Sequence, residues 1–220
     1  MAFIGNDVVD LTDPGNIGKN RNNPFLQRIF TNAEREYIAA AAEPDVMLWA
    51  LWAAKEAAYK VASKTDLLAV FTPRLFAVNL FPGDHGQIRS GMVYSPHGPV
   101  VIRVTVAPDH LHCIGATPLP GILDHVLWDI ERLSTSEEGC DQDPSMAVRR
   151  LAGRRLAELL HVTAADIDIR RFHDIDKWGP PTPCLDGQPV PFDLSLSHDG
   201  AFVAYAMIPF FLQDHPVRQS

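Results

Sequence analysis

Helical periodicity is strongest in residues 47–64, which read MLWALWAAKEAAYKVASK. The stretch is rich in Ala, Leu, Lys and Glu and contains no Gly or Pro, so it predicts a long helix with Asp45 as its N-cap. Trp52, Glu56 and Lys60 fall four residues apart and therefore share one stripe of that helix. Taken alone, the Glu–Lys spacing is typical of an exposed ion pair, which is the ordinary interpretation.

Alternating periodicity replaces the helical pattern over residues 72–117. It predicts strands at 75–80, 87–94, 100–106 and 112–116. The turn sequences PGDHG, SPHGP and APDH separate them, so we expect an antiparallel meander packed against the helices. His110 and His112 have no third ligand at a suitable spacing, and a polar strand face is therefore favoured over a metal site.

The flanking segments carry clear start and stop signals. Residues 3–9 predict a short strand that runs into an acidic turn, and Thr31 with Glu34 forms a capping box for a helix through residue 42. Asp143-Pro144 predicts the start of another helix. The remaining expectations are a helix over 122–133, an exposed linker over 134–143, a strand at 167–172, a proline-rich loop at 177–183, and a hairpin formed by 192–197 and 201–208 about Asp199-Gly200.

A weak internal echo bears on the organisation of the chain. Residues 104–118 and 194–209 share a strand, a turn, a second strand and a final proline. The simplest interpretation is an α+β fold built as a pseudo-twofold pair of similar halves, residues 1–118 and residues 119–220, each a small antiparallel sheet packed with helices. Chance similarity between two hairpins is the alternative.

Composition narrows the class of protein. With 220 residues, 46% hydrophobic and 21% charged, the chain reads as globular, with no apolar run for a membrane span and no export signal at its start. Three scattered cysteines, Cys113, Cys140 and Cys184, fit a reducing cytoplasm without disulfides or zinc. The net charge of −8 argues against nucleic-acid binding, so an acidic partner would need a local basic patch. The candidate patch has Glu34 as its only acid and contains Lys19, Arg21, Arg28 and Arg35.

Three motifs fall at strand, helix and hairpin positions: GNDVVDL at residues 5–11, WAAKEAAYK at 52–60 and SLSHDG at 195–200. Together they resemble the 4′-phosphopantetheinyl transferase superfamily, whose members carry a G-x-D strand end, a helical K-E-A/S-x-x-K motif and an S-L-S-H turn. Each motif alone is weak, and the ordered combination is a strong signal. The order is that of the holo-acyl-carrier-protein synthases, whereas the length is that of two-half, surfactin-type members. The resemblance therefore implies an active site between the halves of one chain, for which a monomer suffices.

The resemblance implies transfer of 4′-phosphopantetheine from coenzyme A to a serine of an apo acyl carrier protein or carrier domain, with 3′,5′-ADP as the leaving group. The carrier would be an acidic protein of fatty-acid, polyketide or nonribosomal peptide biosynthesis. Asp7 and Glu56 would hold Mg²⁺, with Asp10 as a further acid at the metal. Glu56 would also accept the serine proton, and Lys60 would contact the phosphates.

In the second half, Ser197 and His198 match the residues that bind the phosphates of coenzyme A in the family. The chain departs from the family at Pro180, because relatives often have Gly-Lys/Arg-Pro where this chain has Gly-Pro-Pro. A basic contact to coenzyme A is therefore missing unless Lys177 replaces it. Three further candidates for the 3′-phosphate lie on the second-half helix: Arg149, Arg150 and Arg154.

Two other functions compete with transfer. A catalytically silent module of the same fold, which binds coenzyme A or a carrier protein, is favoured by Pro180 and opposed by the retention of Asp7, Glu56 and Lys60. A serine hydrolase is disfavoured, because neighbouring strand residues such as Ser197 and His198 point to opposite faces and the sequence has no G-x-S-x-G elbow.

Overall fold

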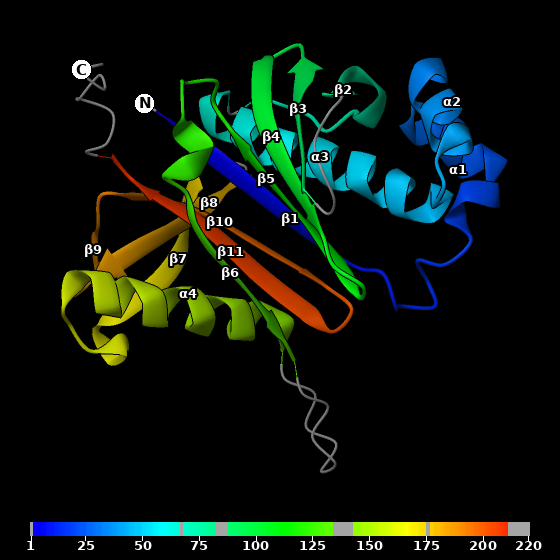
Figure 1. Ribbon diagram of the computed structural model, residues 1–220. Helices are drawn as coiled ribbons and strands as arrows, with labels where there is room; N and C mark the ends of the chain where they lie inside the picture. The colour runs from blue at the N-terminus through cyan, green and yellow to red at the C-terminus, as the bar shows by residue number, and fades with distance from the viewer. Residues whose placement is uncertain (1, 67, 82–87, 134–142, 175–176, 211–220) are drawn as a thin grey trace, which may run out of the picture.

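The computed structural model describes residues 2–66, 68–81, 88–133, 143–174 and 177–210. Two antiparallel sheets lie face to face at the centre of the molecule, and helices cover the outer face of each sheet (Figure 1). The predicted α+β class is therefore confirmed. Among the described residues, no helix combines the length and the apolar character that a membrane span requires.

The first sheet has five strands in the order β1-β5-β4-β3-β2, and every neighbouring pair is antiparallel. It confirms the predicted meander and adds the N-terminal strand at its edge. The strands are β1 (Ile4–Asp10), β2 (Ala77–Leu80), β3 (Ile88–Ser95), β4 (Gly98–Val106) and β5 (His110–Ala116).

Three helices flank this sheet: α1 (Asn23–Ile29), α2 (Asn32–Ala40) and α3 (Pro44–Thr65). The capping box is confirmed, since Thr31 N donates to Glu34 Oε2 at 2.8 Å and Glu34 N donates to Thr31 Oγ1. The predicted N-cap Asp45 is wrong, because α3 begins at Pro44 and its N-cap residue is Glu43, two residues before Asp45. The Asp45 carboxylate instead accepts hydrogen bonds from the backbone amides of Gly18 and Asn20, in the segment after β1, and does not cap its own helix.

The second sheet has the order β10-β11-β6, with β6 (Leu127–Arg132), β10 (Phe192–Asp199) and β11 (Phe202–Pro209). Helix α4 (Pro144–Leu160) packs on its outer face, and Asp143 is its N-cap as predicted. The expected helix over 122–133 is wrong: a short 3₁₀ turn, Ile122–Asp124, is followed by β6. Strand β6 pairs with β11 along its whole length, and these non-local hydrogen bonds outweigh a moderate local preference for helix.

A third, smaller sheet is formed by β7 (Ile167–Asp174), β8 (Lys177–Leu185) and β9 (Gln188–Pro189). The expected loop at 177–183 is therefore wrong, since this proline-rich stretch is extended and pairs with β7. Strand β9 spans two residues and pairs only with Cys184 and Leu185. In the described structure the rest of that side of β8 is not paired with a strand, and it is the side that Pro181 and Pro183 face. Pro180 faces β7 instead, where the register shifts between Arg171 and His173.

The two main sheets share one strand order. In each, a strand is followed by a helix and then by a hairpin whose second strand pairs with the first strand, giving β1-β5-β4 and β6-β11-β10. The echo seen in the sequence falls on the two hairpins. A two-fold rotation between the halves, and a boundary at residue 118, stay predictions. The expected linker lies almost wholly outside the described residues.

Strand β1 lies at the joint between the two sheets. Ile4 and Val8 pack toward β11, in small clusters that include Ala204 and Ala206. The alternate residues of β1 face α3 instead. One strand therefore presents one set of side chains to the first-half helix and the other set to the second half of the chain.

Candidate active site

Gly5 explains why β1 and α3 lie so close together. A Cβ atom at this position would sit 2.0 Å from the carbonyl oxygen of Ala57 and 3.0 Å from Cβ of Lys60. Only glycine lets the strand pass the helix backbone at this distance. Asp7 is two residues further along β1, on the same face, and so its side chain also meets α3.

Asp7, Glu56 and Lys60 form a compact charged group on this face. Lys60 Nζ donates to Asp7 Oδ1 at 3.0 Å and to the carbonyl oxygen of Asn6 at 2.7 Å. Burial raises the pKa of Asp7, although Lys60 opposes the shift. Burial, and then the charge of Asp7, raise the pKa of Glu56 to about 7. Two carboxylates thus share a single ammonium group in a place where water screens them poorly.

The turn between β10 and β11, in the second half of the chain, lies near this charged group. The charges of Asp199 and His198 act on the pKa of Asp7, the first raising and the second lowering it. His198 is exposed, whereas Asp199 Oδ2 accepts hydrogen bonds from Asp10 N at 2.9 Å and from Asn16 Nδ2 at 2.8 Å. The structure therefore places the β10–β11 turn near Asp7, so that the charges of His198 and Asp199 act on it, although no described hydrogen bond or ion pair joins His198 to Asp7, Glu56 or Lys60.

The donor set fits a hard divalent cation. Asp7 and Glu56 offer carboxylate oxygens and an excess of negative charge, which a cation would relieve. No group of three or more His, Cys, Asp or Glu residues in the described part of the chain could hold a metal by itself. The protein would supply two ligands and leave the others to phosphate oxygens and water, as Mg²⁺ sites in phosphate chemistry commonly do.

Asp10 is not grouped with these two carboxylates. It is 3% exposed; its Oδ1 accepts hydrogen bonds from Thr12 N and Oγ1, and its Oδ2 accepts one from Ala201 N at 2.9 Å. Burial would raise the pKa of Asp10, but these hydrogen bonds hold it below the usual value. Asp10 fastens the β10–β11 turn to β1, and a metal role for it stays a prediction.

Ser197 lies inside the joint. Its hydroxyl oxygen is 2.9 Å from Asn6 Nδ2, which also lies 3.1 Å from Nε2 of His112. Burial lowers the pKa of His112 to about 3, so this ring is neutral and can accept the hydrogen bond. Ser197 is 5% exposed, and its predicted role as a coenzyme A ligand is untested.

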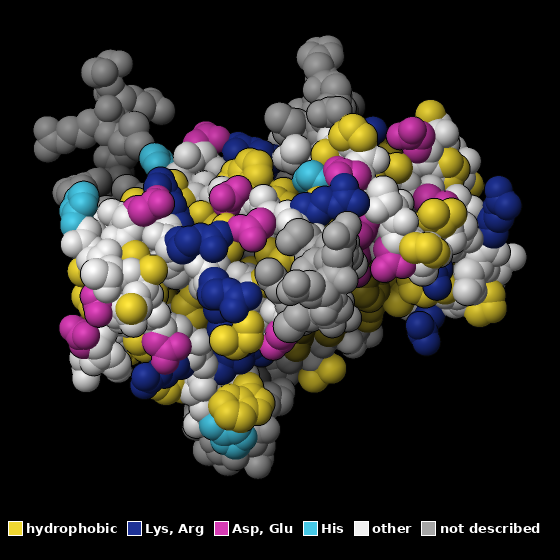
Figure 2. Space-filling model, turned by 90° about the horizontal axis from the view of Figure 1, so that it is seen from below, with side chains coloured by type: hydrophobic (Ala, Val, Ile, Leu, Met, Phe, Trp, Pro, Cys, Tyr) yellow, Lys and Arg dark blue, Asp and Glu magenta, His cyan; other side chains and the backbone are white. Residues whose placement is uncertain are grey.

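The described contacts of the three arginines of α4 are not with Asp7, Glu56, Lys60 or His198. Arg149 donates to the carbonyl and hydroxyl oxygens of Ser145, Arg154 pairs with Glu131 at 2.6 Å, and Arg150 is exposed. Figure 2 views the molecule from the side on which α4 lies, and Lys and Arg side chains gather near the middle of that face. Lys177 begins β8, but its side chain lies outside the described residues.

Two residues of the site region are absent from the sequence-based expectations. Lys64, one turn beyond Lys60, and Asp193, at the start of β10, form a buried ion pair at 2.9 Å. The signal was present in the alternation Asp193, Ser195, Ser197 and Asp199, which marks one polar face of a strand. Lys55 of the K-E-A motif is structural, as it is fully buried and paired with Glu34 at 2.7 Å.

A groove elsewhere on the described surface is separate from this site. It has a volume of about 600 Å³ and lies between the α2–α3 turn and the β4–β5 turn, with walls that include Ala40, Met47 and Pro108. None of Asp7, Glu56, Lys60 or His198 lines it.

The chain is an α+β protein with a group of charged residues, Asp7, Glu56 and Lys60, at the joint of two antiparallel sheets, and its fold is consistent with that of a phosphopantetheinyl transferase. A family model described as the 4′-phosphopantetheinyl transferase superfamily matches residues 3–105 of the chain. The match spans the acidic strand and the K-E-A helix, and it confirms the resemblance for these two motifs, whereas the third motif, at residues 195–200, lies outside it. It supports phosphopantetheine transfer as the general activity. A comparison with curated proteins finds no match.

Proposed function

We propose that this protein transfers 4′-phosphopantetheine from coenzyme A to a serine of an apo acyl carrier protein or carrier domain, in the manner of a holo-acyl-carrier-protein synthase. The observation that supports it most is the meeting of Asp7, Glu56 and Lys60 with the turn that carries His198. The superfamily match over residues 3–105 supports the same activity from the sequence.

Each residue of the group has a role in this proposal. Asp7 and Glu56 would hold Mg²⁺, which when bound would neutralise charge on the diphosphate of coenzyme A. Lys60 would share its charge between Asp7 and a phosphate oxygen, since its ammonium group already lies at the carboxylate. His198, exposed at the turn, would donate a hydrogen bond to a second phosphate oxygen.

The proton of the attacking serine needs an acceptor. The serine oxygen would bond to the β-phosphorus of coenzyme A, and the bond from that phosphorus to the bridging oxygen would break, releasing 3′,5′-ADP. Glu56 would take the serine proton, directly or through a water molecule. Burial and the charge of Asp7 raise the pKa of Glu56 to about 7 in the cation-free site, so its carboxylate is a stronger base than an ordinary glutamate. A bound cation would lower this pKa and keep Glu56 ionised at neutral pH.

The basic patch, defined as Lys19, Arg21, Arg28 and Arg35, is the proposed docking surface for an acidic carrier. Its only acid in the sequence, Glu34, is 4% exposed and neutralised by Lys55, so it does not offset the patch at the surface. Arg21 and Arg28 are exposed. We expect the enzyme to bind the carrier as a monomer in the cytoplasm.

The second candidate, a silent module that binds coenzyme A or a carrier, rests on Pro180. Incubation with coenzyme A, Mg²⁺ and a panel of apo carrier proteins separates the two. We expect at least one carrier to gain the mass of one 4′-phosphopantetheine group by mass spectrometry. Glu56→Gln should abolish the gain, and Glu36→Gln, an exposed residue of α2, should not. Coenzyme A binding by calorimetry without transfer to any carrier would establish the silent module.

A further inference from the structure

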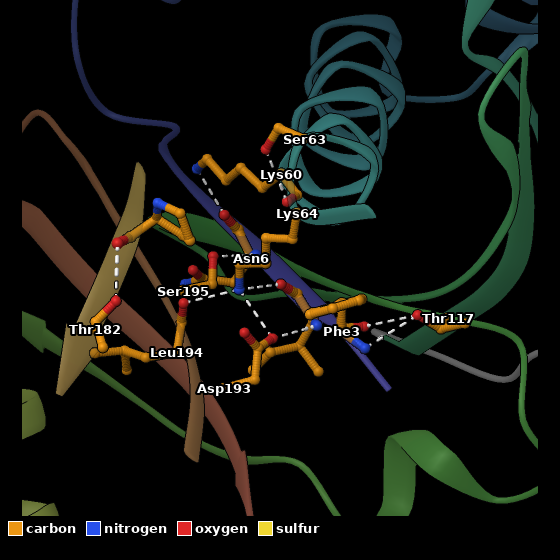
Figure 3. Close-up of polar contacts among 12 residues, drawn as sticks. Phe3, Asn6, Lys60, Ser63, Lys64, Thr117, Thr182, Asp193, Leu194 and Ser195 are labelled. Carbon is orange, nitrogen blue, oxygen red and sulfur yellow. Dashed lines mark hydrogen bonds and ion pairs between the residues drawn. The ribbon is translucent and has the colours of Figure 1, made fainter. Parts of the chain in front are cut away.

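The free edge of β1 is closed by side chains and not by another strand. Three of its outward amides donate to side chains of β10: Ile4 N to Asp193 Oδ2 at 2.7 Å, Asn6 N to Ser195 Oγ at 2.9 Å, and Asp10 N to Asp199 Oδ2 at 2.9 Å. Figure 3 shows Asn6 beside Ser195, with Asp193 further along the same edge. These side-chain hydrogen bonds therefore fix the position of β10, in the second half of the chain, along β1, in the first half.

Lysines of α3 close the carbonyl side of the same edge. Lys60 Nζ donates to the Asn6 carbonyl at 2.7 Å, and Lys64 Nζ donates to the Ile4 carbonyl at 2.7 Å. Four residues of helix rise about 6 Å and two residues of strand rise about 6.6 Å, so the two spacings match. The lysines thus fix β1 along the helix, with Asp7 next to the Lys60 contact.

Lys64 does more than its neighbour, because it also reaches the second half. Its ammonium group donates to Asp193 Oδ2 at 2.9 Å and to the Leu194 carbonyl at 2.8 Å, so its three hydrogens have three acceptors. The Lys64 side chain is 3% exposed. Asp193 Oδ2 in turn accepts from Ile4 N and from Lys64. One buried ion pair therefore joins α3, β1 and β10.

We propose that Lys64 and Asp193 are a positioning pair for the active site. They hold β10 at one fixed point on β1 and α3, and the Asp199–Asp10 contact holds it at a second. His198 lies between these two points, next to the second. The pair touches none of the reacting groups; it places the residues of the second half opposite Asp7 and Glu56. This inference rests on the proposed transfer function in the binding and kinetic parts of its test.

The chain contains a matched control for this pair. Lys55 belongs to the same helix, is fully buried, and pairs with Glu34 at 2.7 Å while donating to the carbonyls of Pro73 and Phe76. All of these partners lie in the first half of the chain. Lys55→Met and Lys64→Met thus remove equivalent buried ammonium groups, and only the second severs a tie between the halves.

The test measures the affinity for coenzyme A by calorimetry, and kcat and KM for coenzyme A with a carrier, in Lys64→Met and Lys55→Met. For Lys64→Met we expect the coenzyme A affinity to fall about tenfold or more, because small displacements of binding groups have effects of this size. Lys55→Met should stay within about twofold of wild type. His198→Ala should have a weaker effect in the Lys64→Met background than in wild type, and its full effect in Lys55→Met.

Equal effects of the two lysine variants on affinity, together with additive effects of His198→Ala in both, would overturn the inference. Where Lys64→Met does not fold, Asp193→Asn carries the same test, since the amide oxygen keeps an acceptor for Ile4 N and Lys64 without the charge. The His198 ring resonances in NMR give a readout that does not depend on function. They should shift in Lys64→Met or Asp193→Asn and not in Lys55→Met. A wild-type protein that neither binds coenzyme A nor modifies a carrier would reject the proposed function, and the NMR comparison would still decide the positioning role.

Discussion

The Glu56 carboxylate is partly buried and lies near Asp7, and both features disfavour its negative charge. The substitution Glu56→Gln removes this charge with almost no change in side-chain shape. The pKa of Glu56 is about 7 in the folded protein against an ordinary value of 4.5. The folded state therefore binds more protons than the unfolded state between these two values. The stability of the wild-type protein that depends on Glu56 is fully present below pH 4.5 and decreases as the pH rises to about 7.

The difference between 4.5 and about 7 corresponds to roughly 3 kcal/mol against folding once the carboxylate is ionised. The side chain is partly accessible to water, so we expect about 2 kcal/mol after screening is considered. Glu56→Gln should be more stable than wild type by this amount at pH 8. The two proteins should differ by only about 0.4 kcal/mol at pH 4.5, where the carboxyl is protonated in the folded state and half protonated in the unfolded state.

Urea unfolding followed by tryptophan fluorescence at pH 4.5, 6 and 8 measures this difference. With an m value of about 2 kcal/mol/M, the midpoints at pH 8 should differ by about 1 M. Glu36→Gln serves as the control, because Glu36 is exposed on α2 and should behave as wild type at each pH. Added Mg²⁺ and coenzyme A should raise the stability of wild type at pH 8 and leave that of Glu56→Gln unchanged.

A wild-type protein more stable than Glu56→Gln at pH 8 would refute the reasoning, since Glu56 would then have favourable partners when ionised. A difference of constant size from pH 4.5 to pH 8 would refute it as well, because it would show that the charge is not its source. Either result would also remove the main physical reason for placing a cation at Glu56.

Three further predictions follow from single contacts. Gly5→Ala should separate β1 from the Ala57 carbonyl and lower the free energy of unfolding in urea by about 1–3 kcal/mol. It should also weaken the Mg²⁺-dependent binding of coenzyme A, and unchanged binding would contradict the role given to this glycine. Lys55→Met should destabilise by about 3–5 kcal/mol because it leaves Glu34 buried and charged, and adding Glu34→Gln should recover part of the loss; no recovery would show that the charge is not the cause. Arg28→Glu should raise the KM for an acidic carrier several-fold at low salt and much less at high salt, with the KM for coenzyme A unchanged. A KM for the carrier that does not depend on salt would reject the basic patch as the docking surface.

Much of the candidate site follows from local signals. The K-E-A helix, the capping box at Thr31 and the C-terminal hairpin are set by residues close in sequence, and the structure contains all three. The hairpin turn lies one residue later than predicted, at Gly200-Ala201, because Asp199 pairs with Phe202. The motif around Asp7 also showed which residue types the chemistry needs. Its first residue, Gly5, gained a physical reason only from the structure, through its contact with the backbone of α3.

Elements that depend on distant partners were the ones that local signals misassigned. Strand β6 has a moderate helical pattern and becomes a strand because β11 offers it a complete ladder. Strand β8 accepts its prolines because, among the described residues, most of one side is unpaired and the ladder with β7 is interrupted by a register shift on the other side. Asp10 has the same chemistry as Asp7, yet the turn of β10–β11 takes its carboxylate.

The sequence by itself determined the identity of the charged groups and the elements that carry them, because helix, turn and strand preferences act over a few residues. Only the tertiary structure decided which of these groups meet. Lys60 and Lys64 are both lysines on one helical stripe, and the packing of β10 against β1 alone makes the first a member of the site and the second a tie between the halves. The energy of such long-range contacts depends on the whole packed arrangement, and no short stretch of sequence contains it.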